Sequence, residues 1–147
     1  MIYYFVAVNY NNTKVTLEYI QSILNLKGNK DYKIIIIDNN SEVAKFNNLK
    51  NKIEGNKKIT LIRNKCNIGY FPGLNVGIKY IKNTKNSERM TGNNDLKFKN
   101  DFLIKLGNIN YNRNVYVIAP NVITIDGFHE NPHFLNKIST IKKIYFS

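Results

Sequence analysis

The chain has 147 residues, and its 22 lysines and arginines against 10 acidic residues give a formal net charge of +12. This length suits one domain of roughly 100–200 residues with a hydrophobic core. A basic balance favours anionic partners such as nucleic acid, acidic lipid head groups or phosphorylated small molecules. The lysines are scattered, without a run of about five or six like charges, so a general bias in residue usage explains most of them equally well.

The compartment is indicated by three absences in the sequence. Cys66 is the single cysteine, so no disulfide can form within the chain, which fits a reducing compartment. The apolar run near the N-terminus has no basic region before it and is too short for a signal-peptide core. No stretch approaches ~20 apolar residues. We therefore expect a cytoplasmic protein, and a peripheral position at the inner face of the membrane is compatible with this.

The first half of the chain alternates strand and helix patterns. Strands are expected at Ile2–Val8, within Lys33–Ser41 and at Lys58–Ile62. The first helix begins with Thr13 as its N-cap and ends at Gly28, and a weaker one spans Ser41 to about Lys52. The order β-α-β-α-β is typical of a parallel, right-handed, doubly wound sheet.

The most informative strand contains four consecutive isoleucines, Ile34 to Ile37. A short β-branched run of this kind predicts a central strand that is covered on both faces. It ends abruptly at Asp38-Asn39-Asn40-Ser41, at the edge where open α/β sheets bind ligands. Asparagine and serine also serve as turn and N-cap residues, so a plain turn remains an alternative for this stretch.

The second half is less regular. Arg63–Gly77 contains three glycines and a proline, which predicts a special loop that enters a helix near Gly73. Asn83–Thr91 is polar and shows no strand pattern. Further elements are then expected in this order: a short helix at Asn100–Leu106, strands at Val115–Ala119 and Val122–Ile125, and a turn at Asp126-Gly127.

Four motifs in succession resemble the inverting family 2 glycosyltransferases of the GT-A type. They are VNYNN at Val8–Asn12, IIIIDNNS at Ile34–Ser41, NIGYFPGLNVGI at Asn67–Ile78 and GNNDLKF at Gly92–Phe98. The resemblance covers about Ile2 to Pro132. It implies a three-layer α/β/α Rossmann-like domain with a mostly parallel central sheet, over residues 1–134, followed by a basic and apolar tail at 135–147.

The resemblance also implies a site for a nucleotide-diphosphate-sugar donor. Asp38 matches the family position that accepts a hydrogen bond from the base, and a carboxylate does this well. Asn9 and Tyr10 would flank the base and ribose, with Tyr10 able to stack on the ring. The remaining donor-site residues that it implies are Asn67, Gly69, Asn75 and Asn93. An ordinary helix-entry loop with asparagine caps is the alternative for residues 67–75.

The triplet Asn93-Asn94-Asp95 matches the acidic triplet of the family, with Asn93 in place of an acid. Asp95 would then hold a divalent cation, Mg²⁺ or Mn²⁺, that bridges the two donor phosphates. Both ions prefer oxygen ligands and need few carboxylates when phosphates supply the rest. The alternative is an Asx-turn that caps a helix.

Two departures from the family bear on catalysis. No apolar strand precedes the triplet, because Ser87–Thr91 contains only Met90 as a clearly apolar residue. Family members also continue for a further hundred residues or so, which carry the acceptor site and the catalytic base. Glu130 is the candidate base in this chain, ahead of Asp101 and Asp126. We therefore expect a glycosyltransferase, or a truncated remnant of one, that transfers the sugar with inversion to a glycan or lipid-linked acceptor in surface polysaccharide synthesis.

A second function class stays open. The chain could instead be a non-catalytic basic module that binds nucleotide-sugar, nucleic acid or an anionic membrane surface. Its tail places Lys137, Lys142 and Lys143 among apolar residues, a pattern compatible with a bilayer surface. For the transferase, no nucleic-acid partner is expected.

Overall fold

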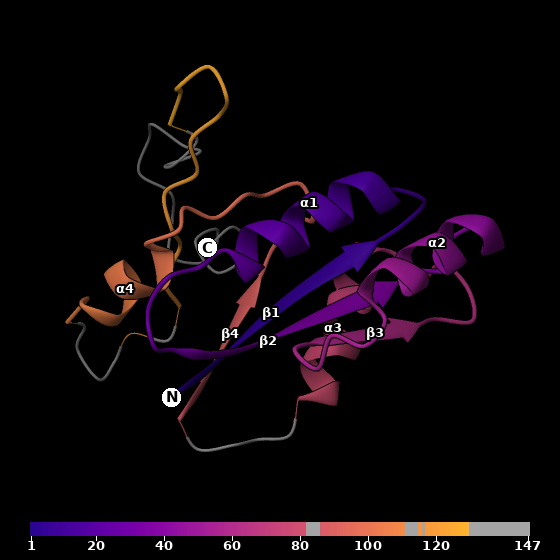
Figure 1. The fold of residues 1–147 in the computed structure, drawn as a ribbon, viewed down its shortest axis with the longest axis horizontal. Helices are drawn as coiled ribbons and strands as arrows, with labels where there is room; N and C mark the ends of the chain where they lie inside the picture. The colour runs from indigo at the N-terminus through magenta and orange to yellow at the C-terminus, as the bar shows by residue number, and fades with distance from the viewer. Residues whose placement is uncertain (82–85, 111–114, 116, 130–147) are drawn as a thin grey trace, which may run out of the picture. The chain divides into compact units, whose positions relative to one another are not determined.

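The computed structural model describes residues 1–81, 86–110, 115 and 117–129. The chain divides into two compact units, Met1–Asn108 and Ile109–Ser147, and each is considered separately. The first unit alternates strands and helices (Figure 1). Its elements are β1 (Ile2–Asn9), α1 (Thr13–Leu24), β2 (Asp31–Asp38), α2 (Val43–Ile53), β3 (Ile59–Arg63), α3 (Tyr70–Tyr80), β4 (Ser87–Thr91) and α4 (Phe102–Gly107).

The four strands form one parallel sheet in the order β3-β2-β1-β4. β2 lies inside the sheet, and all four isoleucines Ile34–Ile37 are buried, as the sequence predicts for a strand covered on both faces. The α/β fold with a parallel central sheet is therefore confirmed. The strand order turns back at β1, which has β2 on one side and β4 on the other. Open α/β sheets bind ligands at such a switch point, outside the carboxyl ends of the strands.

The two faces of the sheet carry separate cores. On one face, Phe5, Ala7, Ile34 and Ile36 pack with residues of α1, α2 and α4. On the other face, Val6, Val8, Ile35 and Ile37 pack with residues of α3. Figure 1 shows α1 and α2 running side by side across the first face. This alternation has a period of two, and it decides which side chains at the carboxyl edge share a face.

Helix α3 approaches the sheet closely because two glycines face it. A Cβ on Gly73 would come within 3.0 Å of Val8 Cγ2, and one on Gly77 would overlap Val6 Cγ1. The helix begins at Tyr70, earlier than the predicted start near Gly73. Pro72 is tolerated there, because the N–H groups of the first helical turn have no partner within the helix.

Two predicted details of α1 are wrong. Its N-cap is Asn12, and the Thr13 hydroxyl instead donates to the carbonyl oxygen of Lys45 in α2 at 3.0 Å. The helix ends at Leu24, with Asn25 as its C-cap, so Gly28 lies beyond the end. Gly28 has φ +105°, which belongs to the turn leading into β2.

The prediction that residues 83–91 contain no strand is wrong for their described part. Ser87–Thr91 form β4, which pairs with Ile2–Val6 of β1. The strand lies at the edge of the sheet and is only partly buried, so it lacks a two-faced apolar pattern. Residues 83–85 lie outside the described part of the chain.

In the second unit, strands are expected at Val115–Ala119 and Val122–Ile125. Residues 115 and 117–119 form no strand, and residue 116 lies outside the described residues. Of Val122–Ile125, only Ile123 pairs, in an isolated antiparallel bridge to His129. The predicted Asp126-Gly127 turn is present, because the Gly127 amide donates to the Thr124 carbonyl at 3.0 Å. Glu130 and the tail at 135–147 lie outside the described residues.

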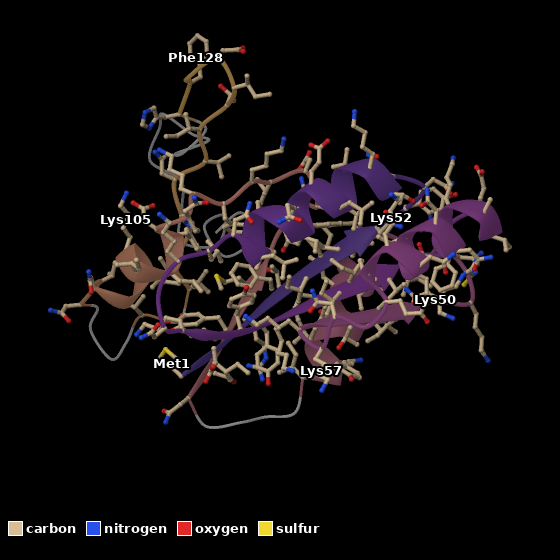
Figure 2. The ribbon with its side chains drawn as sticks, viewed as in Figure 1. Met1, Lys50, Lys52, Lys57, Lys105 and Phe128 are labelled. Carbon is tan, nitrogen blue, oxygen red and sulfur yellow. The ribbon has the colours of Figure 1, made fainter. Side chains whose placement is uncertain are left out.

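The basic residues of the first unit are spread over several elements. Figure 2 labels Lys50 and Lys52 on α2, Lys57 between α2 and β3, and Lys105 on α4, and all four are exposed. The described helices are all too short, or too polar, to cross a bilayer.

Candidate functional site

A row of polar side chains closes three neighbouring strands. Asn9 ends β1, Asp38 ends β2 and Arg63 ends β3, and the register pairs Asn9 with Asp38 and Asp38 with Arg63. Asn9 Nδ2 donates to Asp38 Oδ1 at 2.8 Å. Arg63 Nε lies 3.5 Å from Asp38 Oδ2. Each of these three strands is apolar and ends in a polar residue, and the parallel sheet brings Asn9, Asp38 and Arg63 together at its carboxyl edge.

Asp38 is completely buried, and protein groups occupy its carboxylate. Besides Asn9 and Arg63, the backbone amide of Ser41 donates to Asp38 Oδ2 at 3.0 Å. Arg63 is held from its other side, where Nη2 donates to the Ser41 carbonyl at 2.7 Å and the guanidinium lies over the Phe46 ring at 4.3 Å. Every partner of Asp38 is a donor, which is the arrangement a buried carboxylate requires.

Asn39, the next residue, fastens the glycine-rich loop to the sheet. Its Nδ2 donates to Asn67 Oδ1 at 2.6 Å and to the Gly69 carbonyl at 3.2 Å. Its Oδ1 accepts from Asn64 Nδ2 at 3.0 Å and from the Ile68 amide at 3.2 Å. Gly69 has φ +88°, a conformation that favours glycine, and it is the N-cap of α3. One asparagine side chain therefore determines how the loop meets the carboxyl edge.

The triplet Asn93-Asn94-Asp95 lies in a turn after β4. No helix begins after it until Phe102, so the alternative of a helix cap does not apply. Asn94 Nδ2 donates to the buried Thr16 hydroxyl of α1 at 2.8 Å. Asp95 is exposed. Burial raises the pKa of Tyr70, and the negative charge of Asp95 raises it further.

An open pocket of about 290 Å³ lies at this edge of the sheet. It is bounded by the ends of β1 and β2, the starts of α1 and α3, and the turn after β4. Its lining is mostly polar but uncharged, and consists of Val8, Tyr10, Asn12, Asn39, Asn67, Tyr70 and Asn94. Tyrosine rings offer flat apolar surface, and asparagine amides offer both donors and acceptors. A larger groove of about 460 Å³ lies elsewhere, between α1 and α2, and has no tyrosine and one asparagine, Asn48, in its lining.

The sequence-predicted residues divide between the pocket and its surroundings. Tyr10 and Asn67 line the pocket. Asn9 and Asp38 are fully buried beside it. The Gly69 amide donates to Asn67 Oδ1 within the loop, and the Gly69 carbonyl accepts from Asn39 Nδ2. The remaining predicted residues, Asn75 on α3 and Asn93 and Asp95 in the turn, are exposed and are not among the lining residues.

Sequence reasoning missed several lining residues, namely Asn12, Asn39, Tyr70 and Asn94. Strand alternation was the signal that could have found Asn39. Asp38 has the parity of Ile34 and Ile36, which face α1 and α2, whereas Asn39 continues the parity of Ile35 and Ile37, which face α3. Asn94 lies in the triplet already singled out, but its bond to Thr16 joins segments 78 residues apart and leaves no local trace.

The acidic residues of the described chain are spread apart. The described residues contain no group of three or more histidine, cysteine or acidic residues that could hold an ion. The triplet nevertheless supplies oxygen donors, from the Asp95 carboxylate and the neighbouring asparagine amides. Such a set suits Mg²⁺ or Mn²⁺ when a bound diphosphate supplies further oxygen ligands.

Comparison with known proteins places these features in a family. Residues 4–133 match Glycosyl transferase family 2. Among solved structures, S. aureus TarS 1-349 matches with a TM-score of 0.61 and 16% identity over 73% of this chain and 31% of TarS. TarS in complex with UDP-GlcNAc matches with a TM-score of 0.60 and 16% identity, over 73% of this chain and 30% of that one.

The mannosyltransferase PcManGT from Pyrobaculum calidifontis, in complex with GDP-Man and Mn²⁺, matches with a TM-score of 0.58 and 15% identity. That match covers 69% of this chain and 30% of PcManGT. The chain thus spans less than a third of the length of these proteins. No curated protein matches the sequence significantly.

The match to the family extends over almost the whole chain and includes every strand of the sheet except the first two residues of β1. The solved structures share the parallel α/β fold, of the GT-A type. On this evidence the chain belongs to glycosyl transferase family 2.

Proposed function

We propose that the chain binds a nucleotide-diphosphate-sugar in the pocket at the carboxyl edge. It would take part in transferring the sugar, with inversion, to a glycan or lipid-linked acceptor in surface polysaccharide synthesis. One observation carries the proposal: the pocket with its two tyrosines and four asparagines lies at the switch point of the sheet, beside the triplet turn. Family membership supports the reaction class. The bound UDP-GlcNAc of TarS and GDP-Man of PcManGT support the class of donor.

The lining residues suit the parts of a nucleotide. Tyr10 is half exposed and offers its ring for stacking on a base. Asn67 Oδ1 accepts from Asn39 Nδ2 and from the Gly69 amide. The Nδ2 of Asn67 has no bond to the protein among the described residues, so it remains available as a donor. Asn9 and Asp38 do not contact the nucleotide, because their polar atoms already bind protein groups. They hold in place the carboxyl edge against which the base would lie.

The Asp95 carboxylate would hold the divalent cation, together with amide oxygens of the triplet. When bound, the ion offsets the negative charge that grows on the leaving diphosphate. The chain's own contribution is to keep Asp95 exposed in the turn, next to the pocket-lining residue Asn94, where phosphate oxygens of a pocket-bound nucleotide could reach it.

Calorimetric titration of the purified chain with UDP, GDP and dTDP, each with EDTA or with Mn²⁺, tests the proposal. We expect binding of at least one nucleotide, strengthened by Mn²⁺. Tyr10→Ala should weaken binding about tenfold, because stacking on an aromatic ring contributes roughly 1–3 kcal/mol per base. Asp95→Ala should abolish the gain from Mn²⁺ and leave metal-free binding in place.

Matched controls use residues of the same type away from the pocket. Tyr80→Ala removes an exposed tyrosine of α3, and Asp101→Ala removes an acidic residue before α4. Both should bind nucleotides as the unaltered chain does. Absence of binding to all three nucleotides, in either condition, would overturn the donor site.

A further inference from the structure

The turn that carries the triplet is held firmly on both sides. Before it, β4 pairs with β1. After it, the Phe98 ring packs in edge-to-face contacts with Phe5 and Tyr19, at centroid distances of 5.0 and 5.8 Å. Lys97 forms an ion pair with Glu18 of α1 at 2.9 Å. Within the triplet itself, the one side-chain bond to the rest of the described chain is the bond from Asn94 to Thr16.

Thr16 stands at the centre of a chain of hydrogen bonds with a single possible direction. Asp38 can only accept, so Asn9 must turn its Nδ2 toward Asp38 and its Oδ1 toward Thr16. The Thr16 hydroxyl then donates its only hydrogen to Asn9 Oδ1, at 2.7 Å. Its other close acceptor, the Asn12 carbonyl, is farther away at 3.0 Å.

This direction determines the orientation of Asn94. Because the Thr16 hydrogen is committed to Asn9, the oxygen can only accept, and Asn94 must present Nδ2 to it. The Asn94 Oδ1 atom is then the part of the side chain left for a ligand, in a residue that lines the pocket. The charge of Asp38 thus decides, through two intervening side chains, which atom of Asn94 is offered.

We propose that Thr16 is a positioning residue for the donor site, which holds Asn94 so that its Oδ1 is available as an oxygen ligand for the cation that Asp95 would hold. The inference rests on the proposed function for the identity of the ligand and on the geometry alone for the coupling. Thr16 is fully buried, so it touches no ligand and acts through Asn94.

Three variants test the coupling. Thr16→Val keeps the shape and removes the hydroxyl, whereas Thr16→Ser keeps the hydroxyl and removes the methyl group. Thr13→Val is the matched control, because it makes the same change on the same helix at a hydroxyl that bonds to α2 instead. The first readout is hydrogen exchange of a peptide covering residues 92–98, compared with peptides from β1, β2 and β3, and it needs no ligand.

Thr16→Val should accelerate exchange in residues 92–98 about tenfold more than in the three strands, the loss expected for one buried hydrogen bond. The strands are the reference because the substitution also removes the bond to buried Asn9 of β1, and a general loss of stability would accelerate exchange in all four peptides. Thr16→Ser and Thr13→Val should exchange as the unaltered chain does. If Thr16→Val matches Thr13→Val, or if Thr16→Ser fails to restore protection, the positioning role is overturned.

The second readout is the gain in nucleotide affinity from Mn²⁺. Thr16→Val should reduce this gain about tenfold, and Thr16→Ser should retain it. An undiminished gain in Thr16→Val overturns the role. If the unaltered chain binds no nucleotide, the proposed function fails, and hydrogen exchange alone still decides whether Thr16 holds the triplet.

Discussion

At the scale of single residues, Asp38 is the group on which the carboxyl edge depends. It is fully buried, and its partners Asn9, Ser41 and Arg63 come from three different segments. A buried charge is tolerated only when paired and hydrogen-bonded, and leaving its partners unpaired costs more than the bonds contribute. The carboxylate therefore has a structural role, which does not depend on contact with a ligand.

Asp38→Asn should destabilise the first unit by roughly 2–4 kcal/mol. The amide that replaces the carboxylate must turn an N–H group toward one of three donors, and it leaves Arg63 without its anionic partner. The free energy of unfolding in urea, followed by circular dichroism, measures the loss.

Asp101→Asn serves as the control for this change. The Asp101 carboxylate pairs with Lys105 at 2.7 Å on the surface of the chain, so its removal should leave the unfolding midpoint almost unchanged. Equal effects of the two substitutions would contradict a special role for Asp38.

At the scale of elements, the sequence predicted those strands and helices whose patterns are strong. The run Ile34–Ile37 identified the central strand, because a short run of four β-branched apolar residues favours a strand covered on both faces. The sequence did not predict β4, because an edge strand needs less apolar surface and because its pairing with β1 depends on a distant segment. Val115–Ala119 has strong β-propensity, yet its described residues form no strand, since propensity requires a partner.

The candidate site was predictable in outline. Polar residues after each strand marked the carboxyl edge, and Tyr10 and Asn67 do line the pocket. Strand alternation could have placed Asn39 at the pocket, but its bonds to the glycine-rich loop and the role of Thr16 were not predictable, because they join segments that are far apart in the sequence. Long-range hydrogen bonds leave no local periodicity.

The seating of α3 on the sheet gives a prediction at this scale. Gly77→Ala should destabilise the first unit by about 1–2 kcal/mol. The added methyl group overlaps Val6 and lies 3.3 Å from Ile37 Cδ1, and this overpacking exceeds what alanine gains in helix propensity. Thermal or urea unfolding measures the change.

Gly107→Ala is the matched control, at the end of α4. The new methyl group would meet only the flexible end of Lys30, at 3.2 Å from Cε, which can move aside. Stability should stay within about 1 kcal/mol of the unaltered chain, on the favourable side. A loss equal to that of Gly77→Ala would argue against close packing as the cause.

At the scale of the whole molecule, stability should fall in alkaline solution. Burial raises the pKa of Tyr19 above its ordinary value of 10.0, and burial also raises the pKa of Tyr3 and Tyr70. Above pH 10 the unfolded chain loses these protons while the folded chain keeps them. The stabilisation is therefore complete below pH 10 and is lost as the pH rises through the folded-state values.

Tyr19→Phe should make the decline shallower by about 1.4 kcal/mol for each pH unit above 10. The free energy of unfolding in urea, measured between pH 8 and 12, gives the slope. Tyr80→Phe removes an exposed phenol and is the control for the loss of one tyrosine. An identical slope in Tyr19→Phe and in the unaltered chain would refute the assignment.

The late position of β4 in the sequence has a consequence for biosynthesis. Its partner β1 leaves the ribosome before the other strands of this sheet. β2 can pair with β1, and β3 with β2, as soon as residue 63 has emerged. At about 5–20 residues per second, synthesis of residues 64–91 takes roughly 1–6 s. Throughout that interval residues 2–6 of the nascent chain have unpaired backbone groups, with which a strand of another polypeptide can pair. A chaperone that covers this unpaired edge of β1 should therefore have its greatest effect during that interval.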